Sequence, residues 1–180
     1  MMRFKTEKIA LIVSLGLMSG VVYAEVHQKF APKESHEPVM TATLPTETID
    51  YVDHINGWSK QLTMALVEFE TQTLTLNQDP HLYSNQEVMD AYSQIISEIM
   101  ALTTDLIVNP LEMEAQYETA HELFRDSALA YNQAMVSMWD VATFYQLDVN
   151  SDIIDEAFEA SIQHLKTGMT RFQEAVLALN

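Results

Sequence analysis

The sequence predicts an all-α protein: an up-down-up-down antiparallel four-helix bundle preceded by a signal peptide and a flexible N-terminal tail. Three observations support this. From about residue 46 onward, apolar residues recur at spacings of three and four, the period of an α-helix. The same region holds only two glycines and two prolines. It contains no alternating apolar and polar run bounded by turn residues, the pattern typical of a strand.

The first 24 residues are typical of a signal peptide. Arg3, Lys5 and Lys8 precede an uncharged apolar run over residues 9–22, and Ala24 provides the small residue before the expected cleavage point. The run is shorter than the roughly 20 residues that cross a bilayer, so we expect cleavage, export and no membrane span in the mature chain. The predicted organisation is a signal peptide over 1–24, a flexible proline-containing tail over 25–45 and a bundle domain over 46–180.

The composition excludes several classes of function. The chain carries 26 Asp and Glu against 9 Lys and Arg, a net charge of −17. Binding to nucleic acid or to an anionic membrane surface needs a basic footprint, so we expect neither partner. The absence of cysteine excludes disulfides and thiolate metal sites. An exported chain without cysteine also favours a bacterial protein, located in the periplasm or the extracellular medium.

The helical segments are separated by short connections, which bring sequential helices together as antiparallel neighbours. We predict a capping box of Ser84 with Glu87 at the second segment. The third segment is expected to begin at Asn109 and Pro110, since proline is tolerated at the first helical position. An alternative is that the second and third segments form one bent helix in a three-helix coiled coil. The predicted segments are 47–76, 85–107, 110–146 and 151–179.

His121 is the candidate cofactor-binding residue, because it lies on the apolar stripe of the third segment. As a haem ligand it could pair with Met64 or Met100. The expected architecture resembles that of the bundle cytochromes, which implies a haem held between the helices in the bundle core. The Cys-x-x-Cys-His motif of one such group is absent. The alternative is a histidine at the core edge, hydrogen-bonded to a neighbour. Its expected neighbours are Ile95 and Ile96, Leu62–Ala65 and Phe172–Val176.

A second candidate site surrounds the last connection. Asp148, Asn150 and Asp152 place oxygen ligands at alternate positions, with Glu159 further on, as in a calcium-binding loop. Glycine is absent at the sixth position, where such a loop turns sharply. The alternative is a helix–helix turn in which Asn150 or Ser151 caps the last helix.

The aromatic and methionine residues of the third segment are interpreted as core. Met135 and Met138 follow the apolar stripe, where methionine fills irregular gaps. We expect Trp139 to pack near Phe158 across the turn that follows.

The sequence contains no set of nucleophile, base and orienting group and no phosphate-binding loop, so we expect a protein that is not an enzyme and holds no resident cofactor. The favoured function is an exported acidic helical-bundle protein acting by protein–protein interaction, as an accessory, adaptor or chaperone-like protein. One alternative is a bundle that binds haem or an apolar molecule, and another is a calcium-stabilised bundle. The partner and the oligomeric state stay open.

Overall fold

The computed structural model describes residues 51–109 and 111–179, and this part of the chain is helical with no strand. The predicted all-α class is therefore confirmed. The predicted signal peptide over 1–24, the predicted tail over 25–45 and the first four residues of the predicted first helix, 47–50, lie outside the described residues. The described part contains four long helices and two short 3₁₀ helices: α2 (Tyr51–Gln78), η1 (Pro80–Ser84), α3 (Gln86–Val108), η2 (Ala115–Tyr117), α4 (Glu118–Gln146) and α5 (Ser151–Ala178).

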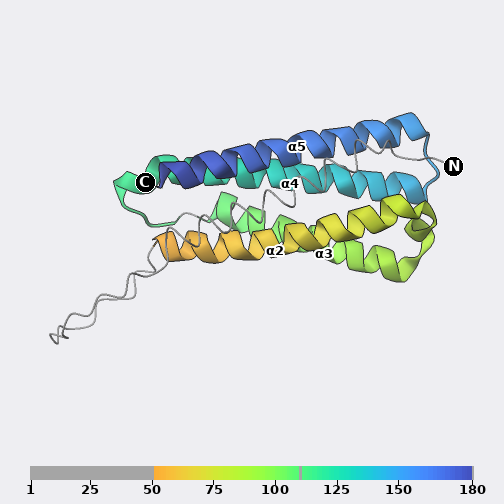
Figure 1. Cartoon of the computed structure of the whole chain (residues 1–180), viewed down its shortest axis with the longest axis horizontal. Helices are drawn as coiled ribbons and strands as arrows, with labels where there is room; N and C mark the ends of the chain where they lie inside the picture. The colour runs from red at the N-terminus through yellow and green to blue at the C-terminus, as the bar shows by residue number, and fades with distance from the viewer. Residues whose placement is uncertain (1–50, 110, 180) are drawn as a thin grey trace.

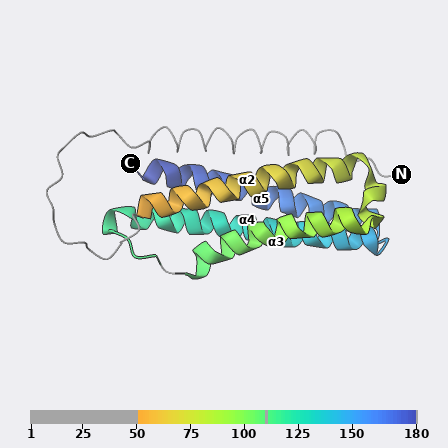
Figure 2. The same cartoon turned by 90° about the horizontal axis from the view of Figure 1, so that it is seen from below.

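The long helices lie side by side with their axes nearly aligned, which gives an elongated molecule (Figures 1 and 2). After η1 the chain turns, and α3 runs back along α2. A short turn joins α4 to α5, and these two helices form the most extensive pairing, while α3 also contacts both α2 and α4. The core therefore lies along the whole length of the long helices.

Aromatic side chains fill this core from one end to the other. Trp58 stacks on Phe172 with ring centroids 6.1 Å apart and meets Phe124 edge-on at 6.0 Å. Toward the other end, Tyr83 stacks on Tyr145 with ring centroids 4.1 Å apart. Such contacts stabilise a core beyond the apolar area that they bury. Other large side chains that are almost fully buried are Ile55, Leu62, Leu76, Tyr92, Ile96, Ile99, Leu106, Met135, Met138 and Phe158.

The pairing of α4 with α5 depends on small residues. The Ser127 hydroxyl donates a hydrogen bond to the Gly168 carbonyl at 2.8 Å, and Ser161 donates to the Ala134 carbonyl at 3.1 Å. Both serines are fully buried, so these bonds satisfy polar groups that would otherwise be costly inside the core. Small side chains at these crossing points allow the two backbones to approach closely.

The starts of α3 and α4 differ from the prediction. Asn85, and not Ser84, caps α3: its side-chain oxygen accepts from the backbone N–H groups of Glu87 and Val88 at 3.1 and 3.3 Å. The start predicted at Asn109 is wrong as well, because Asn109 has extended backbone angles and ends α3. A residue before proline is disfavoured in the helical region, which explains the break.

The chain after α3 does not enter a helix directly. Residues 111–114 are irregular and lead to η2, so α4 begins at Glu118, eight residues later than the predicted start at residue 110. The break between Val108 and Glu118 also contradicts the alternative of one continuous bent helix. At the last turn the prediction holds, since the Asn150 side chain caps α5 by accepting from the Asp152 N–H at 2.9 Å.

One residue predicted to pack in the core is exposed. Trp139 is 45% exposed and does not belong to the core, whereas Met135 and Met138 are buried as expected. Each helical residue is rotated by about 100° from the one before, which moves Trp139 off the stripe that contains Met138. On α3, Leu102 is partly buried and packs against the core. Thr103 beside it is fully buried, and its hydroxyl donates to the Ile99 carbonyl at 2.8 Å.

Candidate functional site

His121 lies in the first turn of α4, beside the first residue of α2. Its Nδ1 is 3.4 Å from the hydroxyl of Tyr51, and its ring meets the Tyr51 ring edge-on with centroids 5.7 Å apart. Tyr117, at the end of η2, stacks on the Tyr51 ring with the two ring centroids 5.1 Å apart. Three elements therefore meet at a small aromatic cluster around one imidazole.

The surroundings of His121 favour its neutral form. Burial lowers the pKa of the imidazole, the positive charges of Arg125 and His54 lower it further, and Glu122 acts in the opposite direction. Burial also raises the pKa of the Tyr51 hydroxyl, which therefore stays protonated. A neutral imidazole nitrogen can accept a hydrogen bond from this hydroxyl. The pair therefore fits the predicted alternative of a core-edge histidine with a hydrogen-bonded neighbour.

The predicted neighbours of His121 on α2 and α3 are wrong. The late start of α4 places His121 only one turn into its helix, next to Tyr51, whereas Leu62 lies about 16 Å further along α2 at 1.5 Å per residue. Four residues later on α4, Arg125 Nη2 donates to the Ile107 carbonyl at 2.9 Å, so His121 lies level with the end of α3 and not with Ile95 or Ile96.

The methionine partners proposed for haem are not brought to His121. Met64 is 65% exposed on the outside of α2, about 20 Å along the helix from Tyr51. Met100 lines a depression on the surface of α3. The His/Met ligand pair expected from the sequence is therefore not assembled.

The acidic residues around the last turn do not adopt the geometry of a calcium loop. Asp148 has a positive φ of 53°, and Asn150 uses its side-chain oxygen to cap α5. Because α5 begins at Ser151, Asp152 and Glu159 lie on a helix about two turns apart. Within residues 51–109 and 111–179, no three His, Cys, Asp or Glu side chains are grouped as metal ligands.

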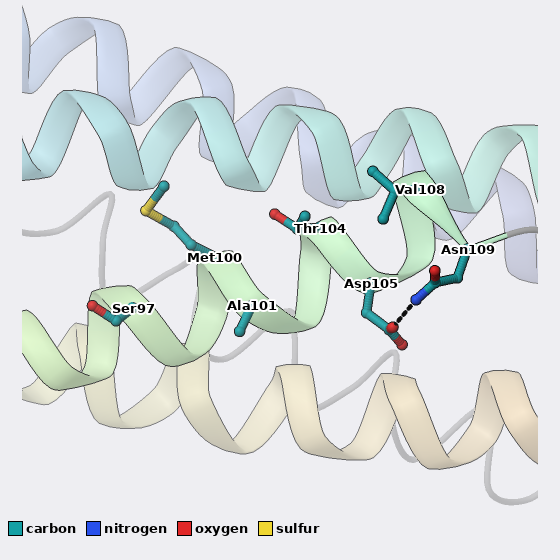
Figure 3. Close-up of a pocket in the computed structure, with 7 residues that line it drawn as sticks. All are labelled: Ser97, Met100, Ala101, Thr104, Asp105, Val108 and Asn109. Atoms are coloured by element: carbon teal, nitrogen blue, oxygen red, sulfur yellow. Dashed lines mark hydrogen bonds between the residues drawn. The ribbon is translucent and has the colours of Figure 1, made fainter.

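The surface of α3 and α4 carries a feature that sequence reasoning missed. Leu129, Val136 and Trp139 are 48%, 46% and 45% exposed on α4. Beside them, α3 carries an open depression of about 560 Å³ lined by Ser97, Met100, Ala101, Thr104, Asp105, Val108 and Asn109 (Figure 3). The sequence did carry a signal for this feature. Val136 follows Leu129 by seven residues and Trp139 follows Val136 by three, and these helical spacings place the three side chains on one flank of α4, outside its core stripe.

Comparison of the chain with protein-family models, with curated proteins and with solved structures found no match. Among the helices that the structure describes, none is both long and apolar enough to cross a membrane.

Proposed function

We propose that the protein is an exported, acidic, up-down-up-down antiparallel four-helix bundle that acts by protein–protein interaction. Its role is that of a periplasmic or secreted accessory, adaptor or chaperone-like protein. In this proposal the leader over residues 1–24 is removed, and residues 25–45 link the bundle to the new N-terminus.

The observation that carries this proposal is the exposure of large apolar side chains on α4. Leu129, Val136 and Trp139 lie on one helix, and each exposes close to half of its surface. Single exposed apolar residues are common, but apolar groups gathered on one face mark interaction sites. Tryptophan is also among the residues that contribute most to protein interfaces. A protein partner that covers this face would remove the apolar surface from water.

The composition of the interior supports a role that does not involve catalysis. Trp58, Phe124 and Phe172 pack against one another about two turns from the end of the helices that holds Tyr51. The stacked pair of Tyr83 and Tyr145 fills the end near η1. His121 of α4 contacts the Tyr51 hydroxyl of α2, and its lowered pKa favours the neutral imidazole in this contact between the two helices. A function located on the outer surface is consistent with both features.

Site-specific photo-crosslinking in the cells that produce the protein tests the proposal. A photoreactive amino acid replaces one exposed residue at a time on each long helix: Met64, Ala101, Val136 and Ile153. We expect a discrete covalent adduct with another protein from at least one position. No adduct from any position, with the chain expressed and exported, would overturn the proposal.

The export step has its own readout. N-terminal sequencing of the protein purified from the medium or the periplasmic fraction should begin at Glu25. A chain that keeps Met1 and stays in the cytoplasmic fraction contradicts export.

A further inference from the structure

We propose that one face formed by α3 and α4 binds a cationic amphipathic helix of the partner protein. This inference rests on the proposed function and specifies both the surface and the chemistry of its occupant. The surface, called here the α3–α4 face, consists of Met100, Thr104 and Val108 on α3 and Leu129, Val136 and Trp139 on α4.

The two halves of the α3–α4 face adjoin each other. Met100, Thr104 and Val108 follow one another at four-residue spacing and extend from α3 on the side of the α4 ribbon (Figure 3). Asn132 of α4 donates to the Met100 carbonyl at 3.4 Å and to the Thr104 hydroxyl at 3.2 Å. Because Asn132 lies between Leu129 and Val136 on α4, these bonds place the α4 side chains alongside the depression on α3.

A hydrogen bond between the two helices also positions the end of the face that contains Val108. Arg125 donates to the Ile107 carbonyl, so Val108 lies next to the turn of α4 that precedes Leu129. Along α4, the ten residues from Leu129 to Trp139 span about 15 Å. This length matches two to three turns of a docked helix, which would present apolar residues at spacings of three and four.

Charge identifies the kind of helix that fits. Residues 51–179 contain 20 acidic and 4 basic side chains. Asp105 lines the depression itself, and Asp126 and Asp140 are neighbours of the exposed α4 side chains in the sequence. Arg125, the basic residue of this region, donates to the end of α3. An occupant with lysine or arginine flanking its apolar stripe would complement this surface.

A second copy of the chain and the tail of the same chain are the alternative occupants of the face. A second copy of the chain would bring two strongly acidic surfaces together, and like charges oppose such an association. The tail of the same chain contains Lys29 and Lys33, so it is the intramolecular competitor. The experiment below distinguishes it from a partner helix.

Trp139 provides a direct readout, because the chain has two tryptophans and the other, Trp58, is buried. The probe is a tryptophan-free peptide of lysine and leucine arranged as an amphipathic helix, titrated into the full-length protein. Binding should shift the emission of Trp139 to shorter wavelength as water is excluded, and Trp139→Phe should abolish the shift. A peptide of the same composition in scrambled order, and one with glutamate in place of lysine, should bind at least about tenfold more weakly.

A matched pair of variants locates the binding. Leu129→Gln with Val136→Gln removes apolar groups from the α3–α4 face, and Met64→Gln with Val67→Gln does the same on the exposed side of α2. All four positions are exposed, so both variants should melt as the wild type does. The first variant should raise the dissociation constant of the lysine–leucine peptide about tenfold, and the second by less than about twofold.

Several results would overturn the proposal. One is equal weakening by both variants, and another is equal binding of the scrambled peptide, which would indicate attraction by net charge alone. Tighter peptide binding after Lys29→Glu with Lys33→Glu would assign the face to the tail of the same chain.

Photo-crosslinking separates this inference from the proposed function. Adducts from Met64 or Ile153 but not from Val136 leave the function standing and contradict the α3–α4 face, whereas the absence of every adduct contradicts both.

Discussion

Gly57 and Gly168 both lie inside long helices, but their surroundings differ. A Cβ atom at Gly57 would meet no neighbouring atom within 4 Å. A Cβ atom at Gly168 would lie 3.0 Å from two atoms of the Tyr131 ring, which is itself buried between α4 and α5. Gly57 therefore has space for a side chain, whereas Gly168 allows α5 to approach Tyr131 of α4 closely.

Alanine substitution should therefore have opposite effects at the two glycines. Gly57→Ala should raise the free energy of unfolding by about 0.5–1 kcal/mol, because alanine favours the helix. Gly168→Ala gains the same helix preference but should lower the free energy of unfolding by about 1–3 kcal/mol, since the added Cβ would lie 3.0 Å from the buried Tyr131 ring and would force that ring to shift within the core. Urea unfolding of both variants checks this, and a stabilised Gly168→Ala would contradict the close approach.

His121 makes stability depend on pH through its lowered pKa. Burial, Arg125 and His54 all disfavour the imidazolium in the folded state, and Glu122 favours it. The unfolded chain therefore binds a proton more readily than the folded chain. The sign follows from linkage: stability is highest above the ordinary histidine pKa of about 6.5 and falls as the pH drops toward the lower folded value.

Replacing His121 should flatten part of this pH dependence. Between pH 7.5 and pH 5.5, the wild type should lose more stability than His121→Gln, because the variant has no proton to bind at this position. Thermal melts across this range provide the measurement, with His164→Gln as the control because His164 lies on α5, remote in sequence from this cluster. Parallel pH curves for the wild type and His121→Gln would contradict the buried neutral imidazole.

At the scale of elements, the ends of the helices decide where functional residues lie. Asn109 adopts an extended conformation before proline, and the chain passes through an irregular segment before α4 begins at Glu118. This later start shifts the register of α4 against α2 by about two turns relative to the prediction. His121 therefore meets Tyr51 at the end of the molecule.

The cap of α3 gives a test at this scale. Asn85→Ala should lower the free energy of unfolding by about 1 kcal/mol, because two backbone N–H groups lose their acceptor. Ser84→Ala should change it by less than about 0.5 kcal/mol, since Ser84 is exposed and is not the cap. Chemical denaturation of the two variants distinguishes them, and a larger loss for Ser84→Ala would restore the capping box expected from the sequence.

At the scale of the whole molecule, charge opposes compactness. With a net charge of −17, acidic side chains repel one another over the surface of an elongated protein. The aromatic core and the pairing of α4 with α5 must exceed this repulsion for the chain to stay folded.

Salt should therefore stabilise the protein. Raising sodium chloride from about 0.01 M to about 0.5 M shortens the Debye length from roughly 30 Å to a few ångströms, which screens the repulsion. We expect the melting temperature to rise by several degrees, measured by circular dichroism. An equal concentration of a neutral sugar serves as the control for general solute effects. A melting temperature that falls with salt would indicate that attractive charge pairs outweigh the repulsion.

Periodicity and composition were sufficient for the helical class and for most of the core, because a side chain such as Leu62 or Met135 faces inward wherever its helix packs. The cap at Asn150 was also predictable, since it depends on a few neighbouring residues. The surroundings of His121 were not, because they depend on where α4 begins relative to α2.

Only the tertiary structure decided the contacts between helices and the surface left over. The predicted helices left the exposure of Trp139 undetermined, because exposure depends on which flank of α4 is covered by α3 and α5. The α3–α4 face likewise exists only once Asn132 has joined the two helices. Local sequence fixes where each helix is apolar, whereas packing between distant segments fixes which apolar groups stay in water.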